Sequence, residues 1–112
     1  MTAREWIRTI QREIRDAEDL QPDRAAELLT TLTALLGNVA DECREADWAF
    51  NVELLRLLET EEAANRARIR AETTPQYQRK REARDTQELA KQLCISLRQF
   101  LRTKSDEMRL TR

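Results

Sequence analysis

The feature that most constrains the fold is an apolar repeat whose members are spaced alternately three and four residues apart. This spacing places its members on one face of an α-helix. The chain has one glycine and two prolines among 112 residues, so it lacks the regularly placed turn residues of a sheet protein. The sequence therefore predicts an all-α fold. The repeat consists of Ala25, Leu28, Leu32, Leu35, Val39, Cys43, Ala46, Phe50, Leu54 and Leu57.

Breaks in the apolar pattern predict three helices, over 3–20, 23–72 and 75–108. Thr2 and Glu5 have the spacing of a capping box at the start of the first helix. Pro75 suits the first turn of the third helix, because its missing N–H is not needed there. Gly37 and Asn38 are the weak point of the long helix, where we expect a kink rather than a stop and restart.

The short connection at Pro75 predicts that the second and third helices are antiparallel neighbours. The expected architecture is an elongated helical bundle, formed by a short N-terminal helix and one long antiparallel helical hairpin. We expect a single domain over 1–112. Because so few helices bury limited apolar area, a homo-oligomer is also expected.

The composition argues against an enzyme and against a metal or cofactor site. Histidine is absent, and no glycine-rich phosphate loop or nucleophile beside a base is found. Cys43 and Cys94 lie on different predicted helices, too far apart along the hairpin for a disulfide, and are expected to be reduced core residues. No apolar run is long enough to cross a membrane. We expect a cytoplasmic protein without cofactors.

A basic stretch between residues 63 and 84 is the main candidate binding site. Its only acids are Glu72 and Glu82, although the whole chain has a net charge of −1. With the bend at Pro75, these cations would gather at the tip of the hairpin and contact phosphates, with Tyr77 stacking on bases. The predicted nucleic-acid-binding residues are Arg66, Arg70, Tyr77, Arg79, Lys80, Arg81 and Arg84.

A cluster of acidic residues in the middle of the long helix supports a different prediction. Its carboxylates would mimic phosphates toward a protein that normally binds nucleic acid. Trp48 lies between two positions of the apolar repeat, so the sequence leaves open whether it is buried or faces a partner. The residues predicted to bind such a partner are Asp41, Glu42, Glu45, Asp47 and Trp48.

Four sequence segments resemble segments of small helical accessory proteins of tailed bacteriophages. They lie at residues 45–51, 67–78, 81–89 and 96–109. The resemblance covers residues from Leu35 onward. Such proteins tend to be encoded near replication and recombination genes, and the resemblance would place this chain in the host cytoplasm. It implies no activity and no site residues.

The leading functional prediction is a non-enzymatic phage accessory protein that serves recombination or replication. It would bind nucleic acid, with single-stranded DNA favoured, or a host or phage nucleoprotein complex. The alternatives are a protein-binding inhibitor of a host defence or regulatory complex, similar in role to an anti-CRISPR protein, and a coiled-coil assembly factor.

Overall fold

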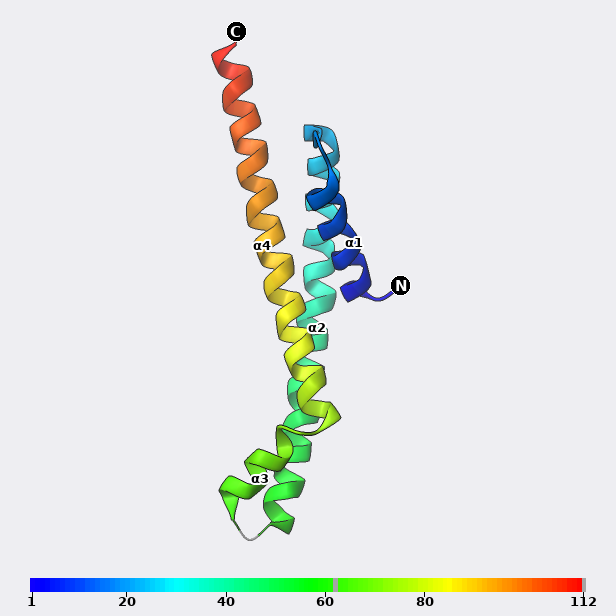
Figure 1. The fold of residues 1–112 in the computed structure, drawn as a ribbon, viewed down its shortest axis with the longest axis vertical. Coiled ribbons are helices and arrows are strands. Elements are labelled where there is room, and N and C mark those ends of the chain that lie inside the picture. The colour runs from blue at the N-terminus through cyan, green and yellow to red at the C-terminus, as the bar shows by residue number, and fades with distance from the viewer. Residues whose placement is uncertain (62, 112) are drawn as a thin grey trace. The chain divides into compact units, whose positions relative to one another are not determined.

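The computed structural model describes residues 1–61 and 63–111, which form four α-helices and no strand. Figure 1 labels α1 (Ala3–Asp16), α2 (Pro22–Thr60), α3 (Ala64–Ala71) and α4 (Pro75–Leu110). The predicted all-α fold is confirmed.

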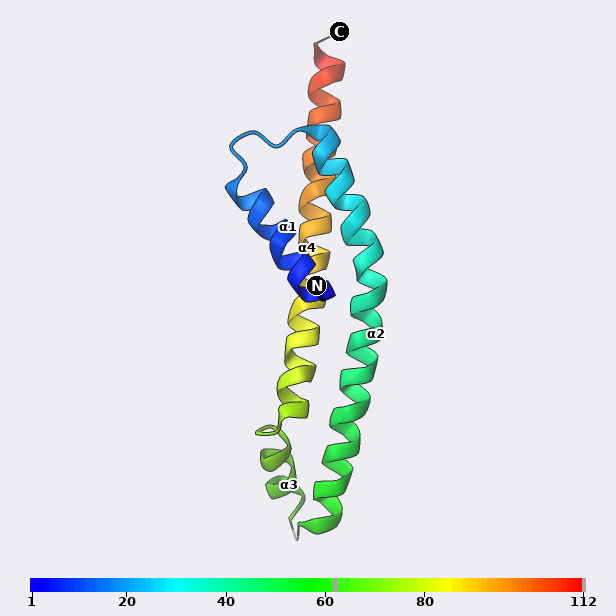
Figure 2. The same ribbon diagram turned by 90° about the vertical axis from the view of Figure 1, so that its right-hand side faces the viewer.

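The chain divides into two compact units, Met1–Asn38 with Glu88–Arg112, and Val39–Gln87. Both α2 and α4 contribute one segment to each unit. Within each unit the α2 and α4 segments run in opposite directions, as Figure 1 and Figure 2 both show. The antiparallel pairing of the long helices is therefore confirmed. That residues 1–112 form a single domain stays a prediction.

In the first unit α1 lies beside the beginning of α2 and the middle of α4, and the last turns of α4 extend beyond both (Figure 1 and Figure 2). The capping box forms as predicted: Glu5 N donates to Thr2 Oγ1 at 3.2 Å, and Thr2 N donates to Glu5 Oε2 at 3.4 Å. α1 ends at Asp16 rather than at residue 20, because the backbone of Ala17 is extended. The buried side chains of this unit are mostly large and aliphatic: Ile7, Ile10, Ala25, Leu28, Leu32, Ala90, Cys94 and Leu97.

An ion pair connects α1 to α2 in this unit. Arg24 Nε donates to one carboxylate oxygen of Glu13 and Arg24 Nη2 to the other, both at 2.6 Å. This two-point contact holds the pKa of Glu13 below its ordinary value.

α2 continues through Gly37 without a break, so a stop and restart at that residue is excluded. Gly37 has no positive φ, and a Cβ added there would meet no atom within 4 Å. The glycine is therefore not required by the backbone or by a close neighbour.

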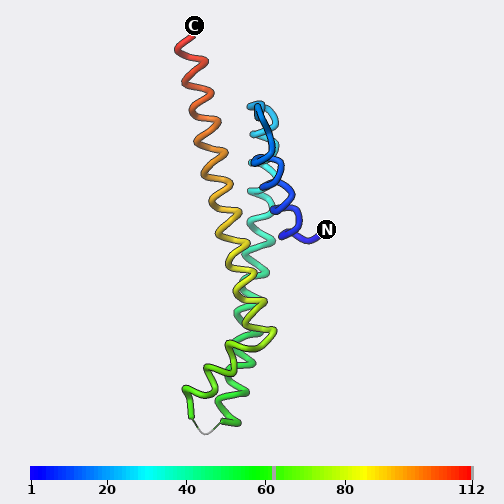
Figure 3. The backbone as a smooth tube through the Cα atoms, viewed as in Figure 1, coloured from blue at the N-terminus to red at the C-terminus, as the bar shows by residue number. Residues whose placement is uncertain are grey.

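The predicted helix over 23–72 is wrong at its C-terminal end. α2 ends at Thr60 and α3 begins at Ala64; residue 62 of the predicted helix lies outside the described residues. The last turn of α2 contains no basic residue. It contains Glu59, whose negative charge interacts unfavourably with the negative end of the helix dipole. Ala63, with φ −113° and ψ 128°, is extended. The chain reverses between α2 and α3, not at Pro75 (Figure 3).

The break at Pro75 is a local interruption between α3 and α4. Thr74 Oγ1 accepts from Tyr77 N at 3.3 Å, so Thr74 caps α4 as predicted. Thr73 and Thr74 hydroxyls also donate to the carbonyls of Arg70 and Ala71 at 2.7 and 2.6 Å, which satisfies two groups at the end of α3. α3 and the first turns of α4 both lead away from the reversal (Figure 3).

We predict that Gly37→Ala stabilises the protein by about 1 kcal/mol, because glycine carries the larger entropic cost in a helix interior. Thermal unfolding followed by circular dichroism should show a midpoint several degrees higher. Ala34→Gly, at an exposed position of the same helix, is the matched control and should lower it. An unchanged midpoint for Gly37→Ala would contradict the prediction.

Candidate interaction surface

The second unit joins two arms of opposite charge. The acidic arm, residues 39–60, has six acidic and two basic residues. The basic arm, residues 64–87, has seven basic and three acidic residues. Since the chain reverses between them, the two arms lie side by side (Figure 1 and Figure 2). Three of the cations expected to contact a nucleic acid, Arg70, Arg79 and Arg84, instead pair with carboxylates of the same chain.

Arg79 makes the strongest contact between the arms. Its Nε and Nη2 donate to the two carboxylate oxygens of Glu42 at 2.7 and 3.0 Å, and Nη2 also lies 3.5 Å from Glu45. This fork geometry is the favoured arrangement of arginine with a carboxylate. The hydrogen bonds from Arg79 hold the pKa of Glu42 below its ordinary value.

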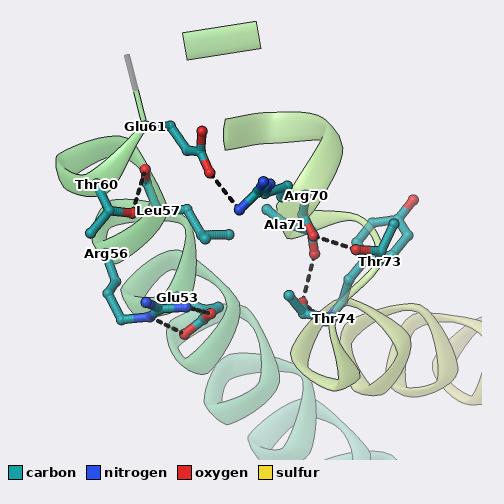
Figure 4. A network of polar contacts seen from close by, with 10 residues as sticks. Glu53, Arg56, Leu57, Thr60, Glu61, Arg70, Ala71, Thr73 and Thr74 are labelled. Carbon is teal, nitrogen blue, oxygen red and sulfur yellow. Dashed lines mark hydrogen bonds and ion pairs between the residues drawn. The ribbon is translucent and has the colours of Figure 1, made fainter. Parts of the chain in front are cut away.

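Two further ion pairs occupy cations of the basic arm. Arg84 Nη2 donates to Asp47 Oδ2 at 2.8 Å. Arg70 Nη1 lies 2.7 Å from Glu61 Oε1, and this pair joins α3 to the end of α2 (Figure 4). The side chain of Glu61 is only 13% exposed, so Arg70 compensates a carboxylate that has lost most of its water.

The aromatic residue of the basic arm lies against the core. Tyr77 is half-buried and packs on the cluster formed by Phe50, Leu57, Ala67 and Ala71. Its ring centroid is 5.6 Å from that of Phe50. Lys80 Nζ lies 4.5 Å from the centroid of Phe50, and Arg81 Cζ lies 5.9 Å from the centroid of Tyr77. Both cations contact aromatic rings of their own unit.

Arg66, Arg68 and Arg70 lie on α3, directly after the reversal, whereas the other four cations lie on α4. The expectation that all seven cations gather at the bend is therefore wrong for those of α4. Arg70, Arg79 and Arg84 are in ion pairs. Arg66, Arg68 and Arg81 are exposed, and no carboxylate in the described part of the chain forms an ion pair with them. Of the six predicted nucleic-acid-binding cations, Arg66, Arg81 and half-buried Lys80 form no ion pair with a described carboxylate.

The predicted acidic patch is likewise engaged within the chain. Glu42, Glu45 and Asp47 contact arginines of the basic arm, and Asp41 pairs with Arg44 on its own helix. One carboxylate oxygen of Asp47 is buried and accepts no hydrogen bond from the described residues. Four of the five residues predicted to bind such a partner are thus in ion pairs within the chain, although the side chains of Asp41 and Glu45 stay 62% and 71% exposed.

The most exposed apolar feature of the unit is the outer face of α2. Trp48 is 70% exposed, Val52 48% and Leu55 58%. Their spacing of four and then three residues aligns them along one side of the helix, opposite the buried Ala46 and Phe50. Sequence analysis left Trp48 open and missed Val52 and Leu55, although their spacing was a usable signal. We call these three residues the outer apolar stripe.

A shallow hollow lies beside Trp48, with a volume of about 440 Å³. Its lining contains an indole and charged groups of both signs, from Arg44, Glu45, Trp48, Ala49 and Arg79. An apolar centre with a charged rim is the usual composition of a protein-binding surface.

Within the described ranges, no group of three or more acidic, cysteine or histidine side chains is placed to hold a metal ion. None of the described helices has an apolar stretch that could span a bilayer. Cys43 and Cys94 are buried and form no disulfide, as predicted. The bend position used for that prediction was wrong, however.

No known protein family, curated protein or solved structure matches this chain. The resemblance to phage accessory proteins therefore stays a prediction.

The ion pair between Arg79 and Glu42 can be tested by a double-mutant cycle. Arg79→Ala and Glu42→Ala should show a coupling free energy of about 0.5–1 kcal/mol, the range of partly exposed pairs with good geometry. The measurement is the free energy of unfolding in urea. Arg81→Ala combined with Glu42→Ala is the control cycle and should show no coupling. Equal coupling in both cycles would contradict the described pairing.

The same pair makes stability depend on pH. Because the folded-state pKa of Glu42 is lowered, its contribution is complete above the ordinary carboxyl pKa of 4.5 and is lost as pH falls through the lowered value. Wild type should be more stable than Glu42→Gln at pH 7, and the difference should shrink below pH 4.5. A difference that stays constant down to pH 2.5 would be the contrary result.

Proposed function

We propose that this chain is a non-enzymatic protein-binding module, and that its binding surface is the outer apolar stripe of α2. The observation that carries the proposal is the 70% exposure of Trp48 within a line of exposed apolar side chains. Tryptophan is enriched among the residues that dominate binding energy at protein interfaces. The proposal belongs to the same class as the predicted protein-binding inhibitor and assembly factor.

The surroundings of the stripe support this proposal. The hollow beside Trp48 gives a partner side chain a place to insert, and Arg44 and Glu45 can form rim contacts. Leu58, 38% exposed, extends the apolar area toward the end of α2. Exposed apolar residues in a continuous line on a helix suit the packing of another helix.

A nucleic acid is the second candidate partner, favoured by the three exposed arginines without ion pairs among the described residues, Arg66, Arg68 and Arg81. Three cations release fewer counterions than the six predicted from the sequence, so binding would be weaker and less salt-dependent. The protein-binding function is preferred, because the other cations of the basic arm are already engaged within the unit.

The proposed function is tested by affinity capture with wild-type, Trp48→Ser and Ile69→Ser baits. Ile69 is 66% exposed on α3 and is the matched control. The captured protein can come from a lysate of the source organism or be a second, differently tagged copy of this chain. We expect the wild-type and Ile69→Ser baits to retain it and the Trp48→Ser bait to lose it. The retention should survive nuclease treatment.

Two results of this capture would contradict the proposal. Retention that disappears with nuclease would favour the nucleic-acid function. Equal retention by Trp48→Ser and Ile69→Ser would show that the outer apolar stripe is not the binding surface.

A further inference from the structure

We infer that the partner of the outer apolar stripe is a second copy of this chain, packed antiparallel against the same stripe. The inference rests on the proposed function, since it names the occupant of that surface. Three observations carry it: the symmetry of the apolar pattern, the opposite charges at its two ends, and the exposure of the whole face.

The apolar pattern is nearly symmetrical about its own centre. Trp48 and Leu55 lie at the two ends, and Val52 lies close to the middle. When two copies of α2 run in opposite directions with their centres aligned, Trp48 of one meets Leu55 of the other, twice. The two Val52 side chains then lie near the symmetry axis. A two-fold interface requires such a self-complementary pattern, because each contact occurs in both directions.

Charged residues beyond the two ends select the antiparallel direction. Arg44 lies four residues before Trp48, and Glu59 lies four residues after Leu55. Antiparallel packing brings Arg44 of each copy beside Glu59 of the other. Parallel packing would instead set Arg44 against Arg44 and Glu59 against Glu59, which is unfavourable. Both residues are exposed and able to reach across.

The contact that Arg44 already makes does not oppose this arrangement. Arg44 pairs with Asp41 on its own helix, and their side chains are 75% and 62% exposed. An exposed pair of this kind contributes little to stability. The guanidinium has five N–H donors and can contact a second carboxylate at the same time.

The size of the surface predicts a modest affinity. The 16 residues from Arg44 to Glu59 span roughly 24 Å of helix at ~1.5 Å per residue. One helix face of this length buries less than the ~800 Å² per partner of a standard interface. We therefore expect a dissociation constant on the order of micromolar, the weak end of the range for specific complexes. Dimer formation should depend on protein concentration.

The test uses charge reversal at the two ends of the stripe. Arg44→Glu alone sets two carboxylates against each other in both end contacts, and Glu59→Arg alone sets two guanidinium groups against each other. Each variant should dimerise at least about tenfold more weakly than wild type. A mixture of the two variants pairs opposite charges at both ends again, so a heterodimer should form more tightly than either homodimer.

Sedimentation velocity over a concentration series gives the affinities, and native mass spectrometry with one variant ¹⁵N-labelled identifies the heterodimer. Arg102→Glu reverses an exposed cation on α4 and is the matched control. It should dimerise like wild type. Trp48→Ser should be monomeric, and circular dichroism checks that every variant is helical.

Two results would overturn the inference. A wild-type chain that stays monomeric up to several hundred micromolar would exclude a second copy as the occupant, whereas Trp48-dependent capture of another protein would leave the proposed function standing. A dimer that Trp48→Ser dissociates, but whose charge variants associate no better when mixed than alone, would exclude the antiparallel arrangement.

Discussion

The second unit depends on close packing of helices over small side chains. Its buried residues include Ala46, Ala67, Ala71 and Ala83. Among the described residues near the reversal, the large buried groups are Phe50 and Leu57. Apolar stabilisation scales with buried area, at roughly 25 cal/mol per Å², so an alanine contributes much less than a leucine. The unit therefore has a weak hydrophobic core for its length, and other interactions must specify how its arms pair.

Charge supplies much of that specification. Glu42 lies 37 residues before Arg79, and Asp47 lies 37 residues before Arg84, so both pairs form only if the chain reverses between α2 and α3. Exposed ion pairs contribute little free energy individually, but like charges in a shifted register would be unfavourable. The basic stretch is thus a complement to the acidic arm. Three cations of the local positive excess in the sequence, Arg70, Arg79 and Arg84, are for this reason paired with carboxylates of the same unit.

Most of the helical structure was predictable from local signals, although the separate helix α3 was not. The capping box at Thr2 and Glu5, the cap at Thr74 and the three- and four-residue apolar repeat all acted as expected. The reversal after Thr60 was not predictable in this way, because no glycine or proline marks it. It depends on burying Ala67 and Ala71 against Phe50 and on pairing two arms far apart in sequence. The exposure of Trp48 was left open because it lies between two members of the apolar repeat, Ala46 and Phe50, and its alignment with Val52 and Leu55 was not used.

The distribution of side-chain size across α2 connects the weak core to the exposed stripe. In the second unit small residues such as Ala46 face inward, while Trp48 and Leu55 face outward. A monomer with this arrangement leaves much of its apolar area in water, and small helical units are poorly stabilised when this happens. Covering the stripe would add buried area that the inner face cannot supply. The proposed association would be linked to the folding of this unit, because any partner that binds only the folded form stabilises it by mass action. The sequence pattern that makes the inner seam narrow is thus the same one that leaves Trp48 and Leu55 exposed on the outer face.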